Sequence, residues 1–286
     1  MIGANTLERI PGPVLLFLAI LSLQAGSAIA ITIFPVFGPI GTMFLRMAFG
    51  ALILIVIYRS DLVAALRQSP LAVLILGAIM TLQSAAFYEA LDRIPLGIAV
   101  AIEFVGPLAV ALVASRKPLD ILFVLLTAGG IVLLTPLVSS DLDPVGLLWA
   151  SVAGVGWASF VIVAKRLGRK LEGGVGLALA MSASAVLLFP FVGVQTLSIL
   201  VGDVALLLPV FAVALLSGAM AFLFEFLTLK TMDMTSFGIL VSIEPGIATL
   251  IGVVTLSESV DAYGWLAVGL ITAASIGATL TRKPDS

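Results

Sequence analysis

The chain alternates between long apolar stretches and short breaks that hold glycine, proline or charged residues. An α-helix needs roughly 20 mostly apolar residues to cross a bilayer. Ten stretches meet this requirement, and their ends fall at residues that terminate helices. They are Pro13–Phe34, Pro39–Tyr58, Pro70–Ala90, Leu96–Ala114, Asp120–Val138, Pro144–Ala164, Gly174–Val194, Ala205–Leu229, Thr235–Leu256 and Ala262–Thr281. The pattern predicts an all-α integral membrane protein. The first stretch is longer than a signal-peptide core, so we expect it to be retained as a span.

Composition supports a lipid-facing surface. Hydrophobic residues make up 61% of the 286 residues and charged residues only 10%, against about 25% charged in soluble proteins. The lipid bilayer is therefore the expected partner of the outer surface. The chain has no cysteine and no histidine, which excludes disulfides and the ordinary zinc, haem and histidine-based sites. No Gly-Lys-Ser/Thr phosphate loop occurs, and we expect neither a metal nor a cofactor.

The basic residues predict the orientation of the chain in the membrane. If both termini are cytoplasmic, all but two of the 14 basic residues fall in inner segments, as the positive-inside rule requires. Arg93 then lies in an outer loop and Arg46 lies within a span. The outer loops instead carry aspartates. This orientation also requires an even number of spans.

The two halves of the chain repeat one another. Ala90-Leu91 is followed by Pro107 and Asp120, and Thr228-Leu229 is followed by Pro245 and Glu258, each 138 positions later (for example, 245 minus 107). Residues 1–138 and 139–286 would then be five-span repeats. Because five is odd, the second repeat would enter the membrane from the opposite side. Such inverted repeats are typical of secondary transporters.

Polar side chains within the predicted spans are the candidates for function. An ionised group at the centre of a span costs about 2.5–3.5 kcal/mol, so such groups must face one another, backbone dipoles or water. One arginine cannot neutralise four glutamates, so some carboxyl groups must be protonated or wet. The set consists of Gln24, Arg46, Gln83, Tyr88, Glu89, Glu103, Glu225 and Glu244.

The charged candidates have two interpretations each. We interpret Glu103 and Glu244 as lining a cavity, where they would bind a substrate ammonium group or carry protons; pairing with Arg46 is the alternative. For Arg46 we favour a structural ion pair over a coupling charge. Glu89 and Glu225 lie closer to the ends of their spans, where solvation at the membrane interface is the simpler interpretation and a structural or coupling charge is the alternative.

Prolines and aromatic residues accompany these groups. A proline inside a helix frees the carbonyl four residues earlier, so we expect helix kinks at Pro107 and Pro245, each with a spare acceptor that is buried or faces water. A kink that only shapes packing is the alternative. Aromatic side chains would either line an apolar part of the pocket or simply pack, and these are Phe87, Tyr88, Phe104 and Trp157. Ala150, Gly154 and Ala158 form a small face that would allow close helix packing.

Several of these segments resemble a known family. The run from Pro95 to Pro118, which contains Glu103 and Pro107, and the segments Ser242-Ile-Glu244-Pro245 and Leu256-Ser-Glu258 are similar to the EamA family of the drug/metabolite transporter superfamily. Within it they resemble the bacterial threonine/homoserine exporters. The resemblance covers essentially the whole chain. It implies ten spans as two inverted repeats and export across the inner membrane by alternating access. It also places Arg46 at the arginine usual in the second span.

We therefore expect a secondary transporter that exports amino acids and related small metabolites. Its substrate would be of the threonine/homoserine type, broad or aromatic, and proton exchange is one source of energy. The expected cavity wall consists of Gln24, Gln83, Tyr88, Glu103, Trp157 and Glu244. The alternatives are an exporter of other metabolites or drugs, a passive channel, and an embedded enzyme acting on lipid-linked substrates. The oligomeric state is left open, with a monomer as the simplest case.

Overall fold

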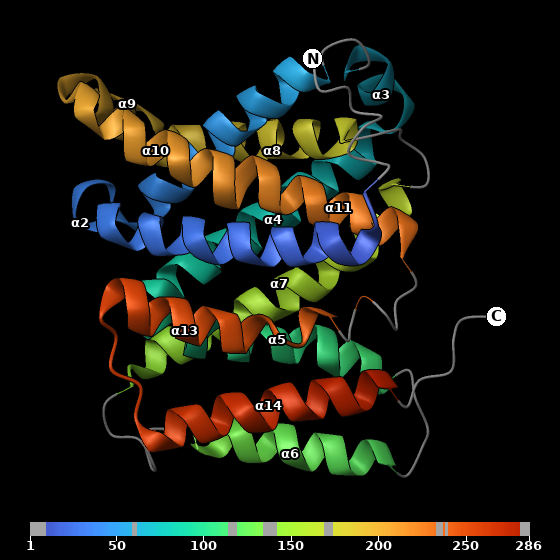
Figure 1. The fold of residues 1–286 in the computed structure, drawn as a ribbon. Helices are drawn as coiled ribbons and strands as arrows, with labels where there is room; N and C mark the ends of the chain where they lie inside the picture. Colours follow the sequence, from blue (N-terminus) through green and yellow to red (C-terminus); the bar gives the residue numbers. More distant parts are fainter. Residues whose placement is uncertain are drawn as a thin grey trace.

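The computed structural model describes residues 10–58, 62–113, 119–133, 142–168, 174–232, 237 and 240–280. Some side chains inside its helices, including those of Pro107, Lys165 and Lys230, lie outside the described part. The described residues form helices and no strand (Figure 1). Among the described residues, five helices are long and apolar enough to cross a bilayer, and three shorter apolar helices accompany them. The prediction of an all-α membrane protein is confirmed.

The first two predicted spans form α2 (Gly12–Ile57), which is interrupted at Gly38. Gly38 has φ 68° and ψ 166°, a backbone conformation that is essentially restricted to glycine. Pro35 and Pro39 lie on either side of it. The blue ribbon in Figure 1 turns back on itself here, so the first two spans are antiparallel neighbours.

Most of the other spans match single helices. These are α4 (Pro70–Leu91), α5 (Leu96–Val113), α6 (Leu119–Leu133), α7 (Pro144–Gly168) and α14 (Ala262–Leu280). Their starts agree with the predicted starts to within one residue. Helices α4 and α7 begin at a proline, α5 and α6 begin directly after one, and α14 begins directly after Asp261. Residues of these kinds are common at helix starts. The short helix α3 (Leu62–Gln68), between the second and third spans, was not predicted.

The seventh and eighth spans contain π-helical turns. The seventh runs through α8 (Val175–Leu188), a π turn at Phe189–Gly193 and α9 (Val194–Gly202). Pro190 lies in this π turn and has no N–H to donate to an α-helical bond. The eighth runs through a 3₁₀ turn (Val204–Leu206), α10 (Leu207–Val213), a π turn at Ala214–Met220 and α11 (Ala221–Thr231).

The ninth span differs from the prediction. Instead of one helix over Thr235–Leu256, α13 covers Glu244–Leu256, and residues 242–243 form a turn before it. Residues 235, 236, 238 and 239 lie outside the described part of the chain. Pro245 lies in the first turn of α13. Residues 240–241 are helical and precede this turn, so the span is interrupted just before Pro245 instead of being kinked around a proline in a helix interior. Pro245 lies where no backbone N–H is required.

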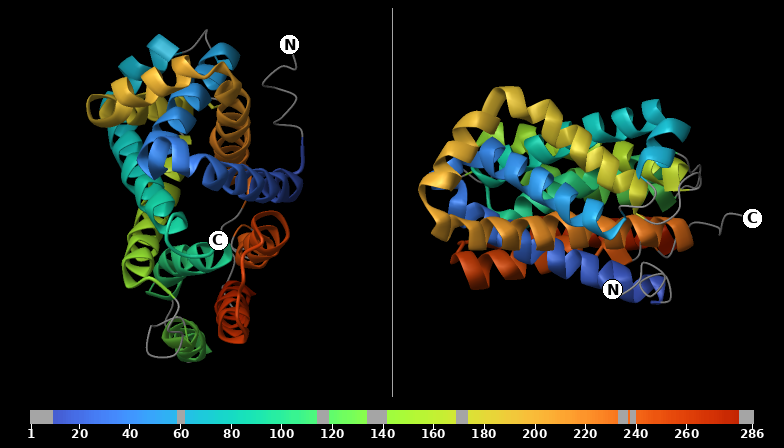
Figure 2. Two further views of the ribbon diagram at one scale, coloured as in Figure 1. Left: turned by 90° about the vertical axis from the view of Figure 1, so that its left-hand side faces the viewer. Right: turned by 90° about the horizontal axis from the view of Figure 1, so that it is seen from above.

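Helices from the two halves of the chain interleave. Helix α5 packs against α13, α6 against α14, and α2 against α8, while α4 contacts both α7 and α8. In Figures 1 and 2, α5, α6, α13 and α14 lie together on one side, and the remaining helices form the other side. A continuous buried core runs through the helices of both halves.

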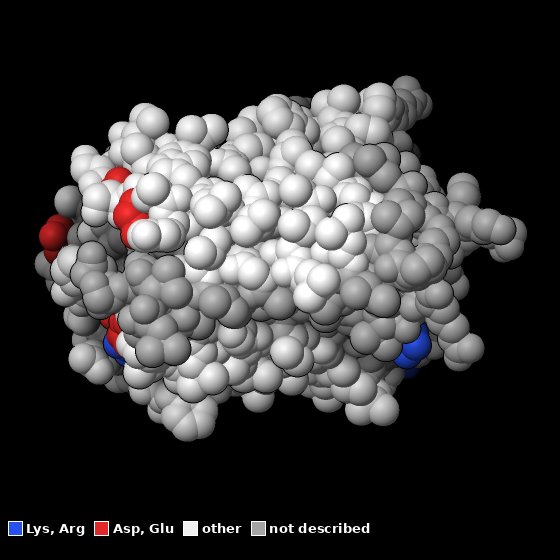
Figure 3. Space-filling model, turned by 90° about the horizontal axis from the view of Figure 1, so that it is seen from below, with Lys and Arg blue, Asp and Glu red and all other residues white. Residues whose placement is uncertain are grey.

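The outer surface is apolar between two charged ends. Side chains such as Val56, Phe191 and Val254 are 73%, 83% and 78% exposed, as expected where lipid replaces water. Figure 3 shows the face seen from below, where the described charged side chains gather at the two ends and leave a wide band without charge. The apolar band is the part of the surface that contacts the acyl chains, so the chain is a multi-pass membrane protein.

Candidate functional site

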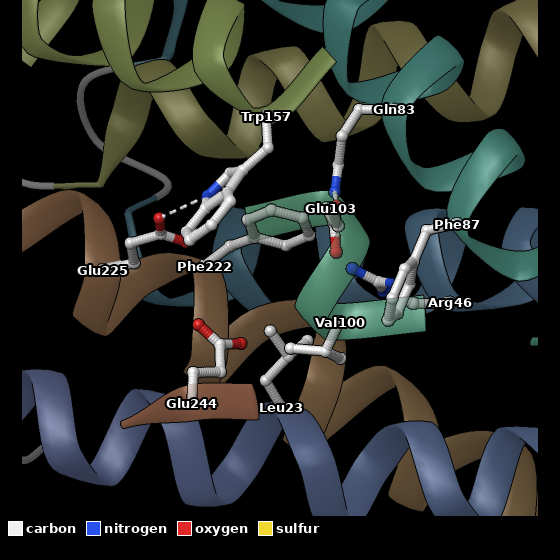
Figure 4. Close-up of a pocket in the computed structure, with 10 residues that line it drawn as sticks. All are labelled: Leu23, Arg46, Gln83, Phe87, Val100, Glu103, Trp157, Phe222, Glu225 and Glu244. Atoms are coloured by element: carbon white, nitrogen blue, oxygen red, sulfur yellow. Dashed lines mark hydrogen bonds between the residues drawn. The ribbon is translucent and has the colours of Figure 1, made fainter. Parts of the chain in front are cut away.

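A small cavity lies among the helices at the centre of the molecule (Figure 4). Its volume is about 40 Å³, which is room for a few water molecules at about 10–15 Å³ each. An adjoining hollow shares Leu23, Trp157, Glu225 and Glu244 with it. The lining side chains come from α2, α4, α5, α7, α11 and α13, and they are Leu23, Arg46, Gln83, Phe87, Val100, Glu103, Trp157, Phe222, Glu225 and Glu244.

Three buried glutamates meet at this cavity, and each accepts a hydrogen bond from one neutral side chain. Gln83 Nε2 donates to Glu103 Oε1 over 2.7 Å, and Gln24 Nε2 donates to Glu244 Oε1 over 2.8 Å. The indole Nε1 of Trp157 donates to Glu225 Oε1 over 3.0 Å. These bonds orient the carboxyl groups without neutralising them, so each keeps acceptor capacity toward the cavity.

This arrangement brings most of the predicted site residues together. Gln83, Glu103, Trp157 and Glu244 line the cavity, and Gln24 lies behind Glu244 as its donor. Glu225 was interpreted as a residue solvated at the membrane interface, and that is wrong: its side chain is buried in the same cluster. Helix α11 continues to Thr231, so Glu225 lies more than one turn inside the end of the helix, where Trp157 packs beside it and donates a hydrogen bond to it.

Arg46 does not form the structural ion pair that was expected. No carboxylate of the described residues lies within 4 Å of its guanidinium. The ion pair in the described part of the chain instead joins Arg93 to Glu89 over 2.9 Å. The Cζ atom of Arg46 instead lies over the rings of Tyr88 and Phe222, at 5.1 and 4.9 Å from their centroids. Cation–π contacts of this kind replace part of the lost hydration.

The remaining candidates lie farther from the cavity. Tyr88 is fully buried and contacts Arg46 and Phe34, so it supports the arginine rather than lining the space. Glu89 lies one turn away from Arg93 and pairs with it at the end of α4. Pro107 falls within α5, but its side chain is outside the described part, so the kink expected there stays a prediction.

A close helix contact supports the cavity from behind. A Cβ atom added to Gly154 on α7 would lie 2.6 Å from the carbonyl oxygen of Glu103 on α5. The small face of Ala150, Gly154 and Ala158 therefore allows the two backbones to touch, as predicted. A second contact joins α2 to the π turn Ala214–Met220. Ser22 Oγ of α2 donates a hydrogen bond of 2.7 Å to the carbonyl of Leu216 and so satisfies an acceptor in that turn.

Sequence reasoning missed three residues of the cavity wall, which are Leu23, Val100 and Phe222. Apolar side chains of this kind look the same in a core and in a pocket, and no periodicity separates the two. Within the described residues, no group of three acidic side chains is placed to share a metal ion.

A helical membrane protein with buried charged and polar groups around a central cavity has the organisation of a solute transporter. Comparison with known proteins identifies it further. The model of the EamA-like transporter family matches residues 144–280. The threonine/homoserine exporter RhtA of Escherichia coli (strain K12) is 35% identical over 275 residues, which cover 96% of this chain and 92% of the exporter. The chain belongs to the EamA-like transporter family.

Other comparisons agree. The threonine/homoserine exporter RhtA of Salmonella typhimurium (strain LT2) is 36% identical over 278 residues, or 94% of this chain and 92% of that protein. A solved crystal structure with 21% sequence identity superposes with a TM-score of 0.65 and covers 94% of this chain and 97% of its own. At that identity the likeness concerns the fold alone.

Proposed function

We propose that this protein exports amino acids of the threonine/homoserine type, and related small metabolites, across the inner membrane by alternating access. The observation that carries the proposal is a buried cavity that presents one cation and three carboxyl groups, in a chain similar over nearly its full length to threonine/homoserine exporters. A zwitterionic solute needs both kinds of charge. The acids face an interior cavity rather than a membrane face, which disfavours chemistry on lipid-linked substrates.

The size of the cavity supports a cycle of opening and closing. Space for a few water molecules is too small for threonine, so a substrate would enter only when helices on the two sides of the cavity separate. Packing supports the inverted repeat as the basis of this motion, because helices of the first half lie against helices of the second half in matching order: α2 packs against α8, α5 against α13 and α6 against α14. Residues 1–138 and 139–286 would be the two repeats.

The charges support an orientation with both termini in the cytoplasm. Arg67 and Arg166 are exposed and belong to predicted inner segments, whereas Asp143, Asp203 and Asp261 belong to predicted outer loops. This distribution follows the positive-inside rule. Export would then move the substrate from the side of the basic residues to the side of the aspartates.

Proton exchange is the proposed source of energy. One arginine does not neutralise three buried carboxyl groups, and low-dielectric surroundings favour uptake of protons or of a cationic ammonium group. Glu103 and Glu244 are the proposed carriers. A substrate that enters with its ammonium group would displace such protons, which links the two fluxes.

Counterflow in proteoliposomes tests the proposal. Vesicles holding the purified protein are loaded with unlabelled threonine, and entry of labelled threonine, homoserine, aromatic amino acids and unrelated metabolites is measured under two imposed pH gradients. The expected result is saturable accumulation of threonine and homoserine that depends on the pH gradient. A passive channel would show no counterflow, and absence of saturable flux for every amino acid contradicts the proposed function.

A further inference from the structure

Arg46 is a buried cation in which two of the three guanidinium nitrogens have no hydrogen-bond partner among the described residues. Its side chain is 2% exposed, and its Nε and Nη1 atoms have no hydrogen-bond partner in the described residues. Burying a guanidinium without an anion is energetically unfavourable, because the lost hydration is not replaced. A folded protein can retain such an unsatisfied group where a ligand supplies the missing partner during function. The free N–H groups of Arg46 therefore indicate a binding position rather than a packing role.

The surroundings of Arg46 hold it in place without satisfying those N–H groups. Tyr88 and Phe222 contact the guanidinium through their rings. Glu103 is near enough for an electrostatic interaction but lies beyond ion-pair distance and accepts its hydrogen bond from Gln83. The planar fork of a guanidinium fits a carboxylate through two parallel hydrogen bonds. A carboxylate brought by the substrate is therefore the anion that this position fits.

The opposite side of the cavity has the complementary charge. In Figure 4, Glu225 and Glu244 lie together away from Arg46, with Phe222, Leu23 and Val100 between the two groups. The two carboxyl groups are close enough to repel each other, and each keeps acceptor positions beyond its single hydrogen bond. A primary ammonium group offers three donors and a positive charge, which would relieve that repulsion.

We propose that Arg46 binds the α-carboxylate of the substrate and that Glu225 and Glu244 bind its α-ammonium group. This inference rests on the proposed function and specifies which groups of the substrate the cavity recognises. The cavity selects zwitterionic α-amino acids in one orientation, and Leu23, Val100 and Phe222 form the apolar strip between the two charged groups. Compounds that lack either the carboxylate or the ammonium group bind weakly.

The experiment combines substrate analogues with variants. Inhibition of threonine counterflow is measured with threonine itself, with threonine amide, which lacks the carboxylate, and with the deaminated acid, which lacks the ammonium group. The wild type is compared with Arg46→Gln, Arg46→Lys and Glu244→Gln. Arg93→Gln is the matched control, because Arg93 lies outside the cavity and pairs with Glu89 at the end of α4. Thermal shifts in detergent give a second readout of binding for variants that transport poorly.

The wild type should bind threonine about tenfold to a hundredfold more tightly than the amide. This is the size of effect expected from the loss of one charge-assisted hydrogen-bonded pair. Arg46→Gln should lose that preference while still binding the amide, and Arg46→Lys should restore part of it. Glu244→Gln should keep the preference but stop discriminating against the deaminated acid. Arg93→Gln should behave as the wild type.

Two outcomes overturn the inference. The first is that Arg46→Gln keeps the full preference for the carboxylate. The second is that it loses binding of threonine and of the amide equally, as a structural role would require. If the wild type itself exchanges no amino acid, the proposed function fails instead, so the two failures are distinguishable.

Discussion

Gln24 and Glu244 are separated by 220 positions in the chain, yet the amide of Gln24 donates a hydrogen bond of 2.8 Å to the carboxyl group of Glu244. The bond joins the first span to the start of α13. Both side chains are buried, so this bond has no replacement from bulk water. It fixes the direction in which Glu244 faces the cavity.

Removing this donor should impair transport. In Gln24→Leu the carboxyl group of Glu244 loses its partner, at a cost of about 1–3 kcal/mol for a buried polar group left unsatisfied. We expect the half-saturating threonine concentration to rise about tenfold or more, measured by counterflow in proteoliposomes. Gln195→Leu serves as control, since Gln195 is an exposed residue of α9. Equal kinetics in the two variants would show that Gln24 has no role at the site.

Much of this site follows from the sequence, because intramembrane polar residues are few. Gln24, Gln83, Glu103, Trp157 and Glu244 stand out in apolar spans, and the structure brings them together. The interaction partners of the buried charged groups could not be predicted from the sequence. Arg46 was expected to pair with a carboxylate, but aromatic rings hold it instead, and nothing in the sequence separates these two solutions.

Tertiary packing accounts for the other errors. Glu225 lies toward the end of a predicted span, but Trp157 from another helix donates to it and it lines the cavity. The role of Pro245 depends on where α13 begins. Hydropathy locates a span to within a few residues, but it contains no information on which helix packs beside a given residue. Span positions were therefore predictable, whereas the burial of single residues near the span ends was not.

Neutral replacement of the deep glutamates tests proton coupling. If Glu103 or Glu244 carries the exchanged proton, Glu103→Gln or Glu244→Gln should remove the dependence of threonine flux on the imposed pH gradient, because an amide cannot release a proton at these pH values. Flux is measured at two gradients in proteoliposomes. Glu89→Gln is the control, since Glu89 pairs with Arg93 outside the cavity. Unchanged flux and unchanged pH dependence in both cavity variants would exclude the relay.

Two glycines in different surroundings should respond in opposite ways to replacement by alanine. Gly154 lies at the close contact between α5 and α7, whereas Gly269 faces open space. In Gly154→Ala the new Cβ atom would lie 2.6 Å from the carbonyl oxygen of Glu103, and such overpacking costs about 1–3 kcal/mol. In Gly269→Ala on α14 the new atom meets nothing within 4 Å, so helix propensity should stabilise the protein by about 0.5–1 kcal/mol. Thermal unfolding in detergent measures both. A stabilised Gly154→Ala would contradict the described crossing.

Glu258 joins the loop after α13 to the start of α5. Its two carboxyl oxygens both lie 3.1 Å from the backbone N–H of Leu96, the first residue of α5. An acceptor at this position satisfies a free N–H and complements the helix dipole. Burial raises the pKa of the Glu258 carboxyl group above its ordinary value of 4.5, and the hydrogen bond from Leu96 opposes this shift only in part.

The raised pKa of Glu258 fixes the sign of a pH effect on stability. Between pH 4.5 and the raised value, the folded protein binds this proton more tightly than the unfolded chain, so the free energy of unfolding falls as pH rises. The contribution of Glu258 is therefore complete below pH 4.5 and is lost as pH passes the folded-state pKa. Glu258→Gln keeps a side-chain acceptor but cannot ionise, so it should lack this decline.

Unfolding midpoints in detergent from pH 4 to 7, taken as wild type minus Glu258→Gln, isolate this residue from the other acids. The difference should shift against the wild type as pH rises. Asp203→Asn, which alters an exposed acid that caps a 3₁₀ turn, provides the comparison for loss of a capping carboxylate. A difference that grows in favour of the wild type with rising pH would mean that the hydrogen bond from Leu96 outweighs burial, with Glu258 ionised as the stabilising cap of α5.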